Sequence, residues 1–287
     1  MACNYPKIYN GVLCPCGKCA GCARSYRQTW ITRTVLESYC YEEQRNFFVT
    51  FTYSDEYAPV DGQLSKRDFQ LFIKRLRKDC GSLRYFACGE YGKRSLRPHY
   101  HAILFGFTGT AEDIQRCWGQ GFVYVGNVTP ASCAYVAKYI SKKFDVDWRE
   151  RIAASGRTPE FSLMSRKPGI GFPFVQEIVN GLLRSGLRTV PSVLRINGRF
   201  MVLGRYLRTK ISEMIGITDE EKQEKLKALK QELQNMLNDF YGVAPHPLSD
   251  YFSLPVKDLA GRFTKSRERP DKEYVVRQRD NSFMGKI

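Results

Sequence analysis

Two of the three histidines in this sequence, His99 and His101, are separated by a single residue. Because successive side chains of a β-strand point to opposite faces, a strand here would project both imidazoles from one face and Tyr100 from the other. Two imidazoles on one strand can bind a divalent metal ion. Further along the chain, Tyr135 and Tyr139 have the spacing that places two side chains on one face of a helix. A metal ion beside two tyrosines is suited to cutting DNA and holding the cut end covalently.

A carboxylate completes the expected metal site. Residues 84–90 have the composition of a strand, and the loop of residues 91–96 joins them to the histidine strand, which predicts a hairpin. Pairing in this hairpin would bring Glu90 beside the start of the histidine strand. A carboxylate and two neutral imidazoles suit Mn²⁺ or Mg²⁺, either of which can polarise a scissile phosphate. Histidines in a strand are more often structural, but this pair stands beside an acidic hairpin in a histidine-poor, very basic chain.

The two tyrosines need help to act as nucleophiles, because a tyrosine hydroxyl titrates at about pH 10. Lys138 lies beside them in the sequence and Lys142 one helical turn further. With a metal-bound phosphate, these lysines would help a tyrosine to ionise and attack. Tyrosines at this spacing more often pack in a core, so the prediction depends on their conjunction with the histidine pair. The sequence leaves open which of Tyr135 and Tyr139 attacks first.

A cluster of cysteines near the N-terminus predicts a zinc site. Four thiols fall within residues 14–22, and one more lies upstream. Thiolates at this spacing can surround one zinc ion in a tight turn, which the intervening glycines permit. The expected ligands are Cys3, Cys16, Cys19 and Cys22, with Cys14 competing for the fourth place. A free or redox-active thiol cluster and an iron–sulfur cluster are the alternatives.

The composition indicates a globular, strongly basic protein. The 287 residues are 43% hydrophobic and 13% aromatic, and the formal net charge is +16. Such a surplus of lysine and arginine favours nucleic acid as the partner, since these residues neutralise phosphates and release counterions. A merely soluble basic protein, with charged faces that are only solvated, is the alternative. The residues expected to contact DNA are Lys74, Arg75, Arg77, Lys78, Arg97 and Lys143.

The sequence gives no sign of a membrane segment or of secretion. It contains no apolar run near 18 residues, and its N-terminus lacks the apolar core of a signal peptide. A reducing cytoplasm, with free or metal-bound thiols rather than disulfides, is therefore expected for the ten cysteines.

Hydrophobic patterns predict the elements that must position these residues. A helix is expected over residues 20–43, and Ser65 with Asp68 has the spacing of a helix cap. Thr129 or Ser132 is expected to begin the tyrosine helix. Strands are expected over residues 46–53, 84–90 and 121–126 and in the histidine segment. This mixed order with hairpin neighbours predicts an α+β fold with a central antiparallel sheet flanked by helices.

The signals weaken after residue 144. Residues 160–171 are expected to form an ordered loop, and residues 194–206 short strands around an Asn-Gly turn. Thr218 and Glu221 predict a capped, charged helix that extends to about residue 240, with a narrow apolar stripe. The last 25 residues are polar and basic, as in a disordered tail or an arm that lies on DNA. The stripe consists of Leu226, Leu229, Leu233 and Met236.

These predictions divide the chain into four segments. Residues 1–24 would form the zinc-binding segment, and residues 25–148 the catalytic core. Residues 149–215 would pack on that core as an extension, and residues 216–287 would form the charged helix and basic tail.

Several motifs together resemble those of a known family. His99-Tyr100-His101, with its flanking residues, looks like the two-histidine motif of HUH endonucleases, and Cys88–Gly92 resembles the segment that supplies their third ligand. Tyr135–Lys143 is similar to the two-tyrosine motif of the Microviridae initiators, and Phe48–Tyr53 resembles their first motif. The cysteine cluster and residues 161–171 look like the gokushovirus branch. Tyr100 departs from the usual bulky aliphatic residue, but its side chain should point away from the metal.

The resemblance implies a rolling-circle replication initiator of a small single-stranded-DNA phage, acting in the cytoplasm of the bacterial host. One tyrosine would attack a phosphodiester at the origin, retain the 5′ phosphate and free a 3′ hydroxyl that primes the host polymerase. The second tyrosine would cut the regenerated origin, and the 3′ hydroxyl would then close a circle. The implied partners are single- and double-stranded origin DNA, host helicase and host DNA polymerase, with no membrane.

Two other functions compete with this hypothesis. In a non-catalytic, zinc-containing DNA-binding or packaging protein, His99 and His101 would be core residues. A related HUH relaxase or transposase would make a single cut with the same site. The presence of two tyrosines favours replication.

Overall fold

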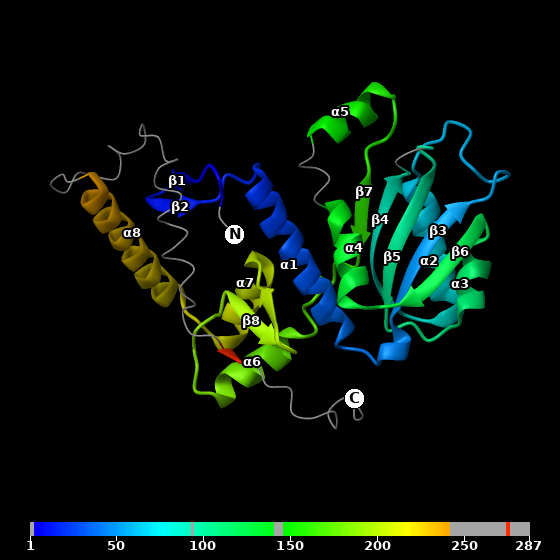
Figure 1. Cartoon of the computed structure of the whole chain (residues 1–287). Coiled ribbons are helices and arrows are strands. Elements are labelled where there is room, and N and C mark those ends of the chain that lie inside the picture. The colour runs from blue at the N-terminus through cyan, green and yellow to red at the C-terminus, as the bar shows by residue number, and fades with distance from the viewer. Residues whose placement is uncertain (1–2, 93–94, 141–145, 242–273, 276–287) are drawn as a thin grey trace.

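The computed structural model describes residues 3–92, 95–140, 146–241 and 274–275 (Figure 1). Its centre is a five-stranded sheet with the order β6-β3-β5-β4-β7, in which every neighbouring pair is antiparallel. The strands are β3 (Phe47–Tyr53), β4 (Arg84–Tyr91), β5 (Pro98–Phe105), β6 (Gly121–Asn127) and β7 (Phe161–Met164). The predicted α+β class with a central antiparallel sheet and flanking helices is therefore confirmed.

Helices cover both faces of this sheet (Figure 1). On one face, α2 (Lys66–Cys80) and α3 (Ala111–Trp118) pack on alternate side chains of β3 and β5, such as Phe51 and Leu104. On the other face, α1 (Ala20–Ser38) and α4 (Pro130–Ile140) pack on Phe86 and Ile103. The alternation of buried side chains along each strand thus divides the core into two layers.

The caps of α2 and α3 show how local sequence sets these helices. The Ser65 hydroxyl accepts a hydrogen bond from the Asp68 N–H, as predicted. The sequence analysis missed α3, although Thr110 and Asp113 form a capping box at its start. This helix buries Trp118, whose indole N–H donates to the carbonyl of Thr52 on the neighbouring strand.

Helix α1 is shorter than predicted: it ends at Ser38 rather than near residue 43. The Asn46 side chain donates to the carbonyl oxygen of Ser38 and so occupies an acceptor at the end of the helix. A 3₁₀ turn, η1 (Glu43–Arg45), follows and leads directly into β3. The long-range contact of Asn46 therefore ends a helix that local propensity would continue.

Residues 161–164 form strand β7 instead of part of a loop. They pair with β4 through the register Phe86↔Met164 to Gly89↔Phe161. A four-residue strand carries too little alternation to be recognised alone, and its pairing partner lies about 80 positions earlier in the sequence. Helix α5 (Val146–Ala154), which was also not predicted, precedes this strand.

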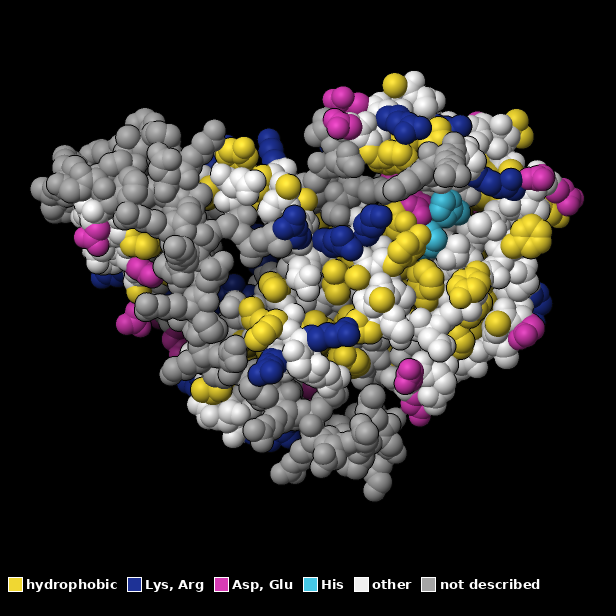
Figure 2. Space-filling model, in the orientation of Figure 1, with side chains coloured by type: hydrophobic (Ala, Val, Ile, Leu, Met, Phe, Trp, Pro, Cys, Tyr) yellow, Lys and Arg dark blue, Asp and Glu magenta, His cyan; other side chains and the backbone are white. Residues whose placement is uncertain are grey.

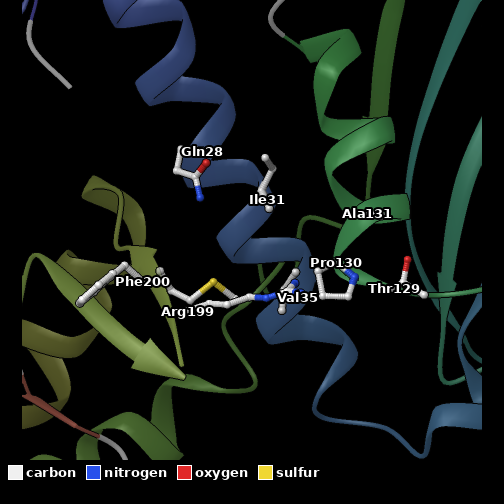
Figure 3. A pocket seen from close by; sticks show the side chains of 9 residues that line it. Gln28, Ile31, Val35, Thr129, Pro130, Ala131, Arg199 and Phe200 are labelled. Atoms are coloured by element: carbon white, nitrogen blue, oxygen red, sulfur yellow. The ribbon is translucent and has the colours of Figure 1, made fainter. Parts of the chain in front are cut away.

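The segment after β7 packs against α1 (Figure 1). It consists of α6 (Val175–Arg184), β8 (Val193–Ile196), β9 (Arg199–Val202) and α7 (Arg205–Ile215), and the predicted hairpin turns at Asn197 and Gly198, both with positive φ. A two-residue strand, β10 (Tyr274–Val275), pairs with β8. A cavity of about 410 Å³ lies between β9, α1 and the start of α4 (Figure 3).

The ends of the chain carry smaller elements. β1 (Lys7–Tyr9) and β2 (Val12–Cys14) form a hairpin before the cysteine cluster, and α8 (Asp219–Tyr241) begins at the predicted Thr218–Glu221 capping box. Of its apolar stripe, Leu233 is buried, while Leu226 and Leu229 stay exposed. The predicted disordered tail or DNA-binding arm lies almost wholly outside the described residues. Within the described part of the chain, no helix is long and apolar enough to span a membrane.

Candidate active site

Glu90, His99 and His101 converge on one face of the sheet. The hairpin register pairs Glu90 with His99, and His101 follows two residues later on the same face. The Nε2 atom of His99 lies 2.9 Å from Glu90 Oε1, and that of His101 lies 2.8 Å from the same oxygen. One ligand atom from each of the three residues lies within 4.8 Å of the others, which is close enough for a shared cation.

The surroundings of His99 fit a metal ligand. Its Nδ1–H donates to the carbonyl oxygen of Arg97, which can only accept. In the neutral ring, Nε2 therefore carries the lone pair and faces the Glu90 carboxylate. Two such acceptors attract only through a proton or a cation between them, so the donor set suits a divalent ion. His101 is oriented in a similar way, since its Nδ1 lies 2.9 Å from the Thr50 hydroxyl.

Glu90 is buried, yet it favours its charged form. Burial alone raises the pKa of this carboxyl, but hydrogen bonds from His101, His99 and Tyr139 outweigh burial and hold the pKa well below its usual range. A buried carboxylate that stays ionised beside two imidazoles is a ready ligand for a cation.

Helix α4 brings both tyrosines to this group. The Tyr135 hydroxyl lies 3.4 Å from His101 Nε2, and the Tyr139 ring stacks on the His101 ring at a centroid distance of 5.7 Å. Tyr135 is 41% exposed, whereas Tyr139 is partly buried. Burial, together with hydrogen bonds to Tyr135 and Glu90, raises the pKa of Tyr139 above its usual range. The two phenols thus meet the same imidazole in different surroundings.

The orientation of α4 follows from its own pattern of side chains. Four of its residues recur at core spacing and are buried against α1 and the sheet. The Thr129 hydroxyl accepts from the Ser132 N–H and caps the helix, so Thr129 rather than Ser132 precedes its first turn. Packing on that stripe leaves Tyr135, Lys138 and Tyr139 on the flank toward the metal site and solvent. The buried residues are Cys133, Val136, Ala137 and Ile140.

The predicted basic residues are spread over several places. Lys138 is exposed on α4, and Arg97, just before β5, binds Asp55 and the carbonyl of Tyr53. Lys142 and Lys143 lie outside the described residues. Figure 2 shows both imidazoles at the surface beside hydrophobic side chains, with lysine and arginine side chains to one side.

The basic residues of α2 lie on the opposite face of the sheet from the histidines. Arg75 donates to the carbonyls of Cys117 and Trp118 at the end of α3, and Arg77 donates to the carbonyl of Leu83. The structure therefore does not bring Lys74, Arg75, Arg77 and Lys78 to the candidate active site. Their contact with DNA stays a prediction, and the two arginines also hold helix ends.

Two residues near the site were not singled out from the sequence. Thr50 orients His101, and the Phe48 ring is parallel to the His101 ring at 6.1 Å while meeting Tyr135 edge-on. Both belong to the outward alternation of β3, a signal that becomes informative only once the neighbour of β3 is known. Tyr100 points to the other face, as expected, where its hydroxyl meets that of Tyr53.

The N-terminal cysteines form a second group. Cys3, Cys16, Cys19 and Cys22 each place a sulfur within 4.8 Å of the others, and Cys14 lies outside the group. The Cys16–Cys22 and Cys3–Cys19 sulfurs are 3.9 and 3.8 Å apart. A tetrahedral zinc site with Zn–S bonds of about 2.3 Å has edges of about 3.8 Å. All ten cysteines are free thiols, so the group can hold a metal ion.

The thiols of this group have divergent pKa values. Burial raises the pKa of Cys22 to about 12. Burial also raises the pKa of Cys19, but hydrogen bonds from the backbone N–H groups of Cys22 and Asn4 outweigh it and lower the pKa to about 6. The fold thus already stabilises one thiolate, the form in which cysteine binds metal.

Comparison with known proteins places this arrangement in context. Residues 46–144, which include the sheet strands β3 to β6 and helix α4, match the family model of the ORF2-type replication-associated proteins. The chain is 34% identical over 154 residues to replication-associated protein VP4 of Bdellovibrio phage phiMH2K, covering 45% of this chain and 48% of the relative. It is 32% identical over 189 residues to replication-associated protein ORF2 of Spiroplasma virus 4, covering 57% of each.

A longer match joins the chain to replication-associated protein ORF4 of Chlamydia phage 1. The two are 25% identical over 257 residues, which cover 79% of this chain and 62% of the relative. The chain thus spans about half the length of the first two relatives and somewhat more of the third. No solved structure matches the chain. The resemblance to phage replication proteins that the motifs predict is confirmed.

Proposed function

Because residues 46–144 match the family of ORF2-type replication-associated proteins, we propose that this chain initiates rolling-circle replication of a single-stranded-DNA phage by nicking its origin. The observation that carries the proposal is the convergence of Glu90, His99 and His101 with the hydroxyl of Tyr135. Carboxylate, imidazole and phenol are the groups needed to place a phosphodiester beside a nucleophile.

The chemistry divides between the metal group and the tyrosines. A divalent ion, Mn²⁺ or Mg²⁺, held by Glu90, His99 and His101 would polarise the scissile phosphate. The Tyr135 oxygen attacks the phosphorus, the bond from phosphorus to the 3′ oxygen breaks, and the phenolic proton leaves as the 3′ oxygen gains one. Tyr135 then holds the 5′ phosphate. Lys138, on the same flank of α4, adds positive charge near the strand.

The second tyrosine makes the reaction repeatable. After one round of synthesis, Tyr139 attacks the regenerated origin in the same way, and the released 3′ hydroxyl attacks the phosphotyrosine on Tyr135. That exchange forms one phosphodiester and frees one phenol, so the bond energy is conserved and no ATP is needed. The partners of this reaction are single- and double-stranded origin DNA, with host helicase and host polymerase extending the primer in the bacterial cytoplasm. The cysteine group holds a structural zinc ion in this proposal.

Covalent trapping tests the nicking step. The full chain, incubated with Mn²⁺ and a single-stranded oligonucleotide that carries the origin of the phage, should form a protein–DNA adduct through a 5′-phosphotyrosine. Replacing both tyrosines, Tyr135→Phe with Tyr139→Phe, should abolish the adduct and preserve DNA binding. Tyr9→Phe is the matched control, since Tyr9 is exposed on β1. An undiminished adduct in the double variant would falsify the assignment.

The metal group is tested separately with Glu90→Gln, which keeps the shape of the side chain and removes its charge. Mn²⁺ affinity should fall by about 10- to 100-fold in calorimetry. Adduct formation at low Mn²⁺ should fall with it, and a high concentration of Mn²⁺ should restore part of it. Equal Mn²⁺ affinity in the two proteins would remove Glu90 from the ligand set.

A further inference from the structure

We propose that Phe122 and Tyr124 on strand β6 form a platform on which unpaired bases of a single DNA strand stack beside the candidate active site. The inference rests on the proposed function, since it names how the substrate strand is held at that site. It is carried by two neighbouring large aromatic side chains that the fold leaves exposed on the histidine face.

Their exposure follows from the alternation of β6. Phe122 is 70% exposed and Tyr124 is 67% exposed, whereas the intervening Val123 and the following Val125 pack toward the core beneath α2 and α3. The fold therefore takes its buried contacts from the valine side of the strand. Single exposed aromatic residues are common, but two on one face beside a reactive group suggest a ligand.

Strand register places these rings in line with the metal group. Thr52 of β3 pairs with Phe122 on one side and with His99 on the other. Thr50 likewise pairs with Tyr124 on one side and with His101 on the other. Side chains at paired positions share a face, so aromatic, threonine and histidine residues form two parallel rows across three strands. Two strand spacings, about 10 Å, separate the rings from the imidazoles.

The surface between the two ends of each row is low. Thr50 and Thr52 carry small side chains, and Gly126 has none, so the Tyr124 ring reaches along the strand toward Phe48. Phe48 in turn lies parallel to His101. A strand that crosses these rows thus meets a ring, a shallow floor and then the metal group. Figure 2 shows hydrophobic side chains exposed on the same face as the histidines.

The chemistry of this surface fits single-stranded DNA better than a protein strand. Bases stack on aromatic side chains with little regard to sequence, and the net charge of +16 favours a polyanion. β6 is an edge strand, but the Gln115 side chain accepts from the Val123 N–H and donates to the Gly121 carbonyl. That contact covers part of the free edge against pairing with another strand.

Stacking requires unpaired bases, which gives a selective test. Fluorescence anisotropy would measure binding of the full chain to a labelled single-stranded oligonucleotide and to its duplex, with EDTA present. Phe122→Ala and Tyr124→Ala should each weaken single-strand binding about 10-fold and leave duplex binding unchanged. Because no phosphate contact is lost, the salt dependence of binding should keep its slope.

Matched variants separate stacking from folding. Phe122→Trp and Tyr124→Phe keep a ring and should retain single-strand affinity. Phe200→Ala, at an exposed aromatic residue of β9, should change nothing. Thermal unfolding should be unaltered in all five, since both β6 rings are exposed.

Three results would overturn the platform. They are unchanged single-strand affinity in the alanine variants, an equal loss of duplex affinity, and a change of oligomeric state in place of a change in affinity. The binding assay contains no metal ion and needs no cleavage, so it fails or succeeds independently of adduct formation. Loss of the adduct alone would count against the nicking proposal and leave the platform intact.

Discussion

Tyr135 and Tyr139 stand one helical turn apart, yet the fold gives them different environments. Tyr135 is exposed and its hydroxyl is next to His101, while Tyr139 is partly buried and hydrogen-bonded to Glu90. An incoming phosphate meets the more accessible hydroxyl first. The two residues are equivalent in the sequence pattern, so this difference arises only when α4 docks on the sheet.

The difference predicts unequal single variants. Tyr135→Phe should reduce the rate of first adduct formation by roughly 100-fold, because it removes the accessible nucleophile. Tyr139→Phe should reduce that rate only a few-fold and should block the later joining of a circle. Single-turnover kinetics on an origin oligonucleotide would measure both rates. A larger loss from Tyr139→Phe in the first turnover would reverse the assigned order.

At the level of elements, Glu37 of α1 links three parts of the fold. Its buried carboxylate accepts from the Arg84 guanidinium at the start of β4 and from the Gly171 N–H. Arg84 also donates to the Pro168 carbonyl. The segment after β7 is thereby tied to α1 and to the sheet that carries the metal group.

Removing this carboxylate should destabilise the molecule. Glu37→Ala leaves the guanidinium of Arg84 and the N–H of Gly171 without their acceptor, and we expect a loss of about 3 kcal/mol in the free energy of unfolding. Urea denaturation followed by circular dichroism would measure it. Glu43→Ala, in the exposed 3₁₀ turn, is the control and should cost little. Equal stability of the two variants would contradict the role given to Glu37.

The cysteine group is a second element whose folding depends on a small number of side chains. We expect about one zinc ion per chain bound by this group. Cys16→Ser should lose that zinc, whereas Cys14→Ser should keep it, because the Cys14 sulfur lies outside the group. Metal analysis of reduced protein would count the ions. Zinc retained in Cys16→Ser but lost in Cys14→Ser would exchange their roles.

On the scale of the whole molecule, basic side chains are found on both faces of the sheet. The lysines of α2 lie opposite the histidine face, so a short strand at the active site should not reach them. Longer or double-stranded DNA has the extent to contact both faces.

This separation can be measured with Lys74→Ala combined with Lys78→Ala. Adduct formation on a short single-stranded oligonucleotide should stay within about twofold. Non-specific duplex binding should weaken, and its salt slope should fall by about 2, as expected for the loss of two phosphate contacts. Lys227→Ala on the exposed surface of α8 is a control of equal charge per site. A large drop in short-strand adduct formation would place the α2 lysines at the reaction.

Local periodicity explains which parts of the fold were predictable from the sequence. The strands with strong alternation, the Ser65, Thr129 and Thr218 caps and the Asn197-Gly198 turn depend on neighbouring residues, and the structure contains them. Helix α3 and strand β7 were missed, since α3 is short and β7 exists only through its pairing with β4.

By itself, the sequence determined that His99 and His101 share one face of a strand and that Tyr135 and Tyr139 share one face of a helix, because those periods are properties of the backbone. Tertiary structure decided that the two faces meet, that Tyr135 is the more accessible phenol, and that β6 sets Phe122 and Tyr124 in line with the histidines. It also decided that the basic face of α2 lies on the far side. These outcomes depend on which strands pair and which stripes become buried, and such long-range choices are settled only when the whole core packs.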